Sequence, residues 1–125
     1  MKGDDISDRL VALAVSIIKV ADSLPDTPTG KHVAGQLLRS GTSPGANYEE
    51  ARGAESRRDF LHKLGVTLKE LQESHYWLRI VAGARLVPTD VTSVISEAAE
   101  LCRIIGKSRI TAKSQPAVEK KGHVR

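Results

Sequence analysis

A helical repeat of apolar residues runs through residues 56–86 without a proline, and it constrains the fold more than any other feature. Apolar side chains recur every three or four positions, the spacing of one α-helix face, at Phe60, Leu61, Leu64, Leu68, Leu71, Leu78, Val81 and Ala82. Ser56 followed by Asp59 resembles a capping box, so we expect a helix to begin there. At about 1.5 Å per residue it would be about 45 Å long. An apolar face of that length needs other helices to cover it.

Three further segments carry helical repeats of apolar residues, separated by short turns. We expect helices over residues 4–24 and 31–53, and a fourth helix between a cap at Thr89 or Asp90 and a C-cap at Gly106. Amphipathic helices with short connections pack as antiparallel neighbours. The sequence therefore predicts an all-α protein, an antiparallel up-down four-helix bundle with a long third helix.

Pro44 lies inside the second predicted helix. A proline there removes one backbone hydrogen bond and costs about 3 kcal/mol. Ser43 and Pro44 also have the form of an N-cap followed by a proline at the first helical position. We therefore expect the second helix to be kinked near Pro44, or broken at residues 41–44, and then to continue to Gly53.

The net charge of +4 comes from the end of the chain. Residues 107–125 contain six basic residues and one acidic residue, which leaves residues 1–106 with 13 basic and 14 acidic residues, a net charge of −1. The last segment also has few apolar residues and no helical repeat. We therefore predict a folded domain at residues 1–106 and a basic, disordered tail at residues 107–125.

The sequence contains no motif of an enzyme active site. It has no nucleophile elbow, phosphate-binding glycine loop or Cys-x-x-Cys pair. Only Asp59-x-x-His62 approaches the Glu-x-x-His pattern of a di-metal bundle. We expect no catalysis, no metal and no cofactor. The single cysteine, Cys102, can form no internal disulfide, and the first apolar segment is too short to span a bilayer. These features favour a cytoplasmic protein with no membrane contact.

Basic residues gather near the ends of the second and third predicted helices. Guanidinium groups match phosphate oxygens, so such a group suits contacts with a nucleic-acid backbone. The candidate residues are Arg39, Arg52, Arg57, Arg58 and Lys63. The alternative is a solvated surface on which these cations pair with the neighbouring acidic residues, and charge alone favours that alternative.

Two adjacent aromatic residues, Tyr76 and Trp77, fall beside the apolar face of the third predicted helix. Large aromatic side chains on such a flank are typical of subunit contacts. Burial of the pair within the bundle itself is an equal alternative.

Two parts of the sequence resemble the signature of a protein family. Gln36-Leu37-Leu38-Arg39-Ser40 is followed by Ser43, Ala46-Asn47 and Glu50-Ala51, and a third helix that starts with Phe60 carries Glu70 and Glu73. This pattern is similar to that of the bacterial 23S rRNA intervening-sequence proteins, four-helix bundles encoded within insertions of ribosomal RNA genes. Leu24-Pro25 matches the first turn of the family. The resemblance covers about residues 6–106, and Pro44 departs from the aliphatic residue expected there.

The resemblance implies a bundle that assembles as a ring-like homopentamer. Similar proteins include the accessory variability proteins of diversity-generating retroelements, which bind nucleic acid and a reverse transcriptase. The family's basic positions correspond to Arg39, Arg52, Arg57 and Arg58. Taken together, we predict a non-enzymatic oligomeric bundle that binds structured RNA or DNA through backbone phosphates. The alternative is a protein-interaction scaffold with no nucleic-acid role.

Overall fold

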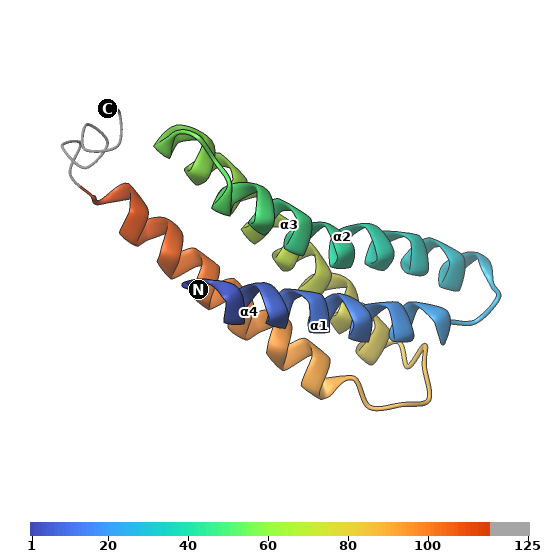
Figure 1. The fold of residues 1–125 in the computed structure, drawn as a ribbon. Coiled ribbons are helices and arrows are strands. Elements are labelled where there is room, and N and C mark those ends of the chain that lie inside the picture. Colours follow the sequence, from blue (N-terminus) through green and yellow to red (C-terminus); the bar gives the residue numbers. More distant parts are fainter. Residues whose placement is uncertain (116–125) are drawn as a thin grey trace.

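The computed structural model describes residues 1–115, which form a bundle of four antiparallel helices (Figure 1). The helices are α1 (Asp4–Asp22), α2 (Pro28–Arg52), α3 (Arg57–Gly83) and α4 (Thr92–Lys113). Each helix packs against the next one in the chain, and α4 also contacts α1. The most extensive contact is between α2 and α3, and the contact between α1 and α4 is much smaller. The predicted all-α bundle with a long third helix is confirmed.

The core of the bundle is aliphatic, because the buried positions recur at helical spacing in every helix. Leu37 of α2 and Leu71 and Leu78 of α3 are completely buried, and each such side chain contributes about 1.5–3 kcal/mol of burial free energy. The core also contains a polar pair between these two helices. The Ser74 hydroxyl donates to the Ser40 hydroxyl over 3.1 Å, so neither buried oxygen lacks a partner.

Side-chain caps fix the starts of α2 and α3. The Ser56 hydroxyl accepts from the Asp59 backbone N–H over 3.0 Å, which confirms the predicted start of α3. Thr27 caps α2 in the same way, and Pro28 takes the first helical position. A proline needs no N–H there. The second helix therefore begins three residues earlier than the sequence repeat predicted.

Pro44 does not break α2, which is continuous from Pro28 to Arg52 (Figure 1). The predicted break at residues 41–44 is wrong, although proline still leaves the Ser40 carbonyl without its usual N–H partner. Pro44 is buried together with its neighbours Leu37 and Gly41. Their packing against the other helices offsets the cost of one missing backbone hydrogen bond.

The fourth helix does not end at Gly106 but continues to Lys113, so the predicted boundary between domain and tail at residue 106 is wrong. Gly106 lies against α3, where a Cβ atom would be 4.0 Å from Leu68 Cδ2. A Cβ atom would fit there in ordinary van der Waals contact, and Gly106 does not end the helix. Further along, Ala112 is buried although its neighbours are polar. The rest of the predicted tail, residues 116–125, lies outside the described residues.

Candidate nucleic-acid interface

Arg39 lies in the middle of α2 and is bound to α3. Its guanidinium donates to Glu73 over 2.7 Å and to Glu70 over 3.1 Å. The hydrogen bond to Glu73, followed by the charge of that carboxylate, raises the pKa of Arg39. Thirteen residues of helix, about 20 Å, separate Arg39 from Arg52. The predicted clustering of Arg39 with the other arginines is therefore wrong, since the sequence distance along one helix already keeps them apart.

Arg52 and Lys63 are held by carboxylates at the junction of α2 with its neighbours. Arg52 Nη2 lies 2.6 Å from Asp4 Oδ1 of α1, and the hydrogen bond between them raises the pKa of Arg52. Lys63 Nζ of α3 lies 2.6 Å from Glu50 Oε1 of α2, and that hydrogen bond raises the pKa of Lys63. Both cations remain charged and join one helix to another.

Arg57 has a different role, at the end of α4. Its Nη2 donates to the backbone carbonyls of Ala112 and Lys113, at 2.6 Å and 2.7 Å. Those carbonyls lie at the negative end of the helix dipole and have no N–H partner within the helix. Of the five predicted phosphate ligands, Arg58 is the one that is exposed and has no ion pair or hydrogen bond within residues 1–115.

Other basic side chains lie along the outside of α3 and its seam with α4, up to about 30 Å from Arg58. We call this surface the α3/α4 basic face, and it consists of Arg58, Lys69, Arg79, Arg109 and Lys113. None of the five forms an ion pair within the part of the chain that the structure describes. Two of the three acidic residues of α3, Glu70 and Glu73, pair with Arg39 of α2, and the third is Asp59 in the first turn. The net charge of the face is therefore positive.

Glycine makes room for one member of this face. The guanidinium of Arg109 lies across Gly65 of α3, 3.2 Å from the position that a Cβ atom would take. Its Nε is buried without a hydrogen-bond partner among the described residues. Short-range sequence patterns do not predict this basic face, because its members are far apart in the chain. The spacing of Arg58 and Lys69, eleven residues or three helical turns, was the signal that could have revealed it.

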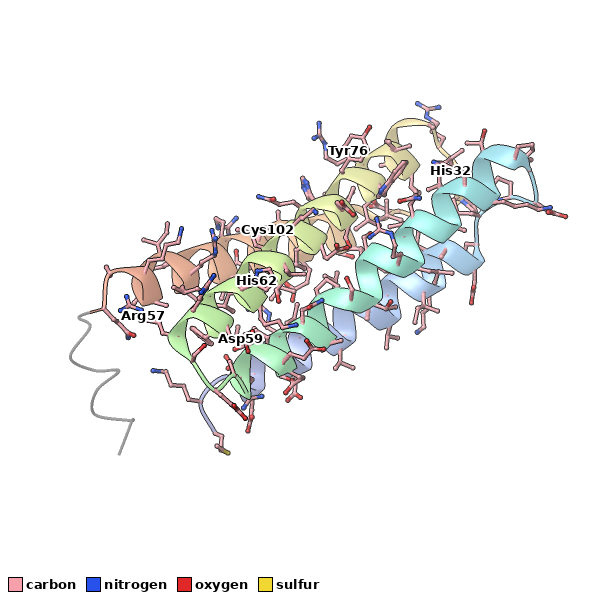
Figure 2. The ribbon with its side chains drawn as sticks, turned by 90° about the horizontal axis from the view of Figure 1, so that it is seen from above. His32, Arg57, Asp59, His62, Tyr76 and Cys102 are labelled. Carbon is pink, nitrogen blue, oxygen red and sulfur yellow. The ribbon has the colours of Figure 1, made fainter. Side chains whose placement is uncertain are left out.

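The two aromatic candidates are separated by the structure. Trp77 packs against the core and meets His32 of α2 edge to face, with ring centroids 5.6 Å apart. Tyr76 points away from the core and is 55% exposed (Figure 2). It touches the edge of Trp77, at a centroid distance of 5.2 Å. Trp77 thus contributes to packing within the bundle, and Tyr76 alone presents its ring to solvent.

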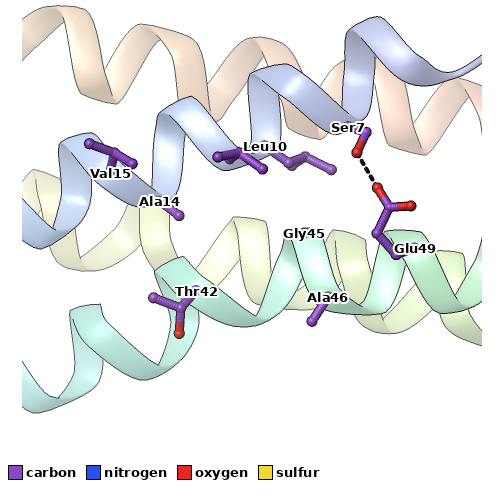
Figure 3. A pocket seen from close by; sticks show the side chains of 9 residues that line it. Ser7, Leu10, Ala14, Val15, Thr42, Gly45, Ala46 and Glu49 are labelled. Carbon is purple, nitrogen blue, oxygen red and sulfur yellow. Dashed lines mark hydrogen bonds between the residues drawn. The ribbon is translucent and has the colours of Figure 1, made fainter.

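An apolar surface lies over α1 and α2. We call it the α1/α2 apolar face, and its exposed members are Val11, Val15, Ile18 and Leu38. Ile18 sits at the edge of the buried stripe of α1. A groove of about 290 Å³ crosses this face (Figure 3). Its lining residues are Ser7, Leu10, Val11, Ala14, Val15, Thr42, Gly45, Ala46 and Glu49.

A larger cavity of about 1020 Å³ opens near the start of α1, between the end of α2, the start of α3 and the last turns of α4. Phe60, Leu64 and Ile104 form its apolar wall, and Arg52 and Lys107 its charged wall. Among residues 1–115, no three His, Cys, Asp or Glu side chains come close enough to bind a metal ion together. None of the described helices has the length and apolar character needed to cross a membrane.

The fold and these surfaces define an all-α four-helix bundle with one basic and one apolar face. Residues 4–107 match the family described as 23S rRNA-intervening sequence protein, so the chain belongs to that family, as its signature residues predicted. It is also similar to a crystal structure from Bacteroides thetaiotaomicron, of a protein of unknown function from the S23 ribosomal protein family. The TM-score is 0.78 at 32% sequence identity, over 88% of this chain and 99% of that chain. No curated protein matches this chain.

Proposed function

We propose that this protein is a non-enzymatic, oligomeric helical bundle that binds structured RNA or DNA through backbone phosphates. The observation that carries the proposal is the α3/α4 basic face, a row of five cations about 30 Å long that form no ion pair among the described residues. A cation already bound to a carboxylate must give up that partner to bind a phosphate. The members of the basic face have no such partner to lose within residues 1–115, so phosphate contacts there cost less.

The family name supports RNA as the first ligand to test, because it refers to intervening sequences of 23S rRNA. Phosphate contacts position a protein on its nucleic acid and carry no base information. Binding through this face is therefore electrostatic and weakly sequence-dependent. The residues predicted from the sequence, Arg39, Arg52, Arg57 and Lys63, contribute less in this proposal, since each is engaged within the bundle.

We further propose a homo-oligomer, a ring of five as the family resemblance implies, in which the α1/α2 apolar face of each copy packs against a different surface of the next copy. Residues 10–18 of α1 contain no charged side chain, whereas two copies meeting through their basic faces would repel each other. A second copy is therefore the occupant that fits this surface. Oligomerisation would display one basic face per subunit, so that weak phosphate contacts add through effective concentration.

The proposal is tested by the salt dependence of binding to a structured RNA. Each phosphate neutralised on a duplex contributes about −0.9 to the slope of log K against log salt concentration. The variant Arg58→Gln/Lys69→Gln should reduce the slope by about 1.8. The control Lys19→Gln/Lys31→Gln has the same net charge but lies outside the basic face, and its slope should equal that of the unmodified protein.

Removal of residues 116–125 tests whether the end of the chain is the binding element, because this segment contains Lys120, Lys121 and Arg125. The truncated protein should retain binding. Loss of all binding on truncation, with normal binding by the double variant, would assign the interaction to the end of the chain.

A second candidate function is a protein-interaction scaffold, for example for a reverse transcriptase, as the similar retroelement proteins suggest. The large cavity at the start of α1 favours this possibility, since two of the apolar side chains that line it, Phe60 and Ile104, are only partly buried. If neither RNA nor DNA binds at low salt, the scaffold is the better description of the protein.

A further inference from the structure

Tyr76 is the most exposed aromatic side chain in the part of the chain that the structure describes. It is 55% exposed, whereas Tyr48, Phe60 and Trp77 are all partly buried. Two exposed cations flank it on α3. Lys69 precedes it by two turns, about 10 Å along the helix, and Arg79 follows it by one turn, about 4.5 Å. The ring therefore lies within the α3/α4 basic face.

The ring of Tyr76 is held in place by its neighbours. It meets Trp77 edge to face, with an interplanar angle of 76°, and Trp77 meets His32 at the same angle. Edge-to-face pairs of this kind contribute about 0.5–1.5 kcal/mol beyond their buried area. A ring that is already ordered loses less conformational entropy when it binds a ligand.

We propose that Tyr76 stacks on an unpaired base of the bound nucleic acid, so that the ligand is RNA or DNA with a single-stranded loop or end. The inference rests on the proposed function and specifies its class of ligand. Proteins bind single strands by combining cations along the backbone with aromatic rings on which bases stack. A duplex cannot use such a ring without unstacking, because its base faces are already covered by neighbouring bases.

A subunit contact is a poorer account of Tyr76. The other exposed apolar residues of α1 and α2, Val11, Val15 and Leu38, form a separate surface over those two helices. Around Tyr76, a contact between copies would have to cover the exposed cations Lys69 and Arg79, which form no ion pair among the described residues. Burying charges that have no partner is unfavourable. A polyanion with an exposed base fits both the charge and the ring.

The test uses two RNAs with the same number of phosphates, a hairpin with an adenine-rich loop and a blunt, fully paired duplex. The full chain should bind the hairpin more tightly than the duplex. Tyr76→Leu keeps the apolar bulk without the ring, and it should lose about ten-fold in hairpin affinity while its duplex affinity and salt slope stay unchanged. Tyr76→Phe keeps the ring and should bind both RNAs as the unmodified protein does. A fluorescent adenine analogue in the loop should be quenched by the proteins that keep the ring.

The possible failures are distinguishable. Equal binding of hairpin and duplex, unaffected by Tyr76→Leu, overturns base stacking but leaves phosphate binding in place. No binding of either RNA at low salt overturns both proposals. A change in oligomeric state of Tyr76→Leu, measured by light scattering, would show that the ring is a subunit contact and would also overturn the stacking role.

Discussion

The guanidinium of Arg57, at the first position of α3, donates to the carbonyls of Ala112 and Lys113 at the end of α4. This contact joins residues 55 and 56 positions apart in the chain. It gives a side-chain donor to two carbonyls of the last turn, of which Ala112 also accepts a 3.4 Å hydrogen bond from the Gln115 N–H, and it places a positive charge at the negative end of a helix dipole. The extension of α4 beyond Gly106 therefore depends on a side chain from α3.

Arg57→Ala should destabilise the protein by about 1.5–3 kcal/mol, the range for a hydrogen bond to a charged group. The loss should be concentrated in the last turns of α4, where amide hydrogen exchange should accelerate. Urea unfolding measures the first effect. The matched control is the adjacent Arg58→Ala, which removes the same charge without such a contact and should cost less than about 0.5 kcal/mol. Equal effects of the two variants would contradict the capping role.

Gly41 and Gly35 should respond in opposite directions to substitution by alanine. A Cβ atom at Gly41 would lie 2.6 Å from Ile17 Cγ2, because α1 and α2 approach each other closely there. We expect Gly41→Ala to cost about 1–3 kcal/mol by overpacking. A Cβ atom at Gly35 meets nothing within 4 Å, so Gly35→Ala should stabilise the helix by about 0.5–1 kcal/mol. Thermal unfolding of the two variants measures whether each substitution raises or lowers the stability of the protein.

The fold was accessible from the sequence because its main determinants are local. The apolar repeat of α3 and the cap at Ser56 act within a few residues of each other, and both are confirmed. The continuation of α2 through Pro44 and of α4 through Gly106 was harder to predict. Pro44 is tolerated because its surroundings are buried, and beyond Gly106 the end of α4 is bound by the Arg57 guanidinium. Both depend on contacts between helices, which no local rule contains.

The candidate site was less accessible for the same reason. Charge and residue type identified Arg39 and Arg58 equally well, but only the bundle shows that Arg39 is held by Glu70 and Glu73. The packing of Arg109 over Gly65 joins two helices that are separated in the chain. The helical spacing on α3 could have revealed the three members of the basic face on that helix. The two members on α4 could not be predicted without knowing which side of α4 packs along α3.

The ion pair of Arg9 with Glu97 should make stability depend on pH on the acid side. Arg9 donates two hydrogen bonds to the carboxylate, at 2.8 Å and 2.9 Å, which lowers the pKa of Glu97 below its ordinary value of 4.5. A group with a lowered pKa in the folded state stabilises the protein above its unfolded pKa. This contribution is lost as the pH falls through the folded pKa.

Glu97→Gln should therefore lower the free energy of unfolding at neutral pH by less than about 1 kcal/mol, because both side chains are partly exposed. The difference from the unmodified protein should vanish at low pH. Glu55→Gln is the control, since Glu55 is exposed and forms no ion pair within residues 1–115. Denaturant unfolding at neutral and acidic pH measures both. A difference that persists unchanged at acidic pH would contradict the expected linkage.

Val15→Glu should dissociate the proposed oligomer without unfolding its subunits. Val15 lines the groove of the α1/α2 apolar face and is 45% exposed, so a carboxylate there can be solvated in a monomer but not between two copies. Light scattering should report a multimer for the unmodified protein, five chains if the ring forms, and a monomer for the variant. Ser96→Glu, at an exposed position of α4 away from residues 10–18, should remain assembled.

A cooperative urea transition and an unchanged helical circular dichroism for monomeric Val15→Glu would show that the new charge acts on assembly and leaves the subunit folded. A monomeric unmodified protein at high concentration would refute oligomerisation itself. If Val15→Glu assembles like the unmodified protein, the copies meet elsewhere, and the surface around Tyr76 and Trp77 becomes the next candidate. The predicted outcome follows from the absence of charge over residues 10–18, since an apolar surface that associates in water loses its driving force when one member must stay hydrated.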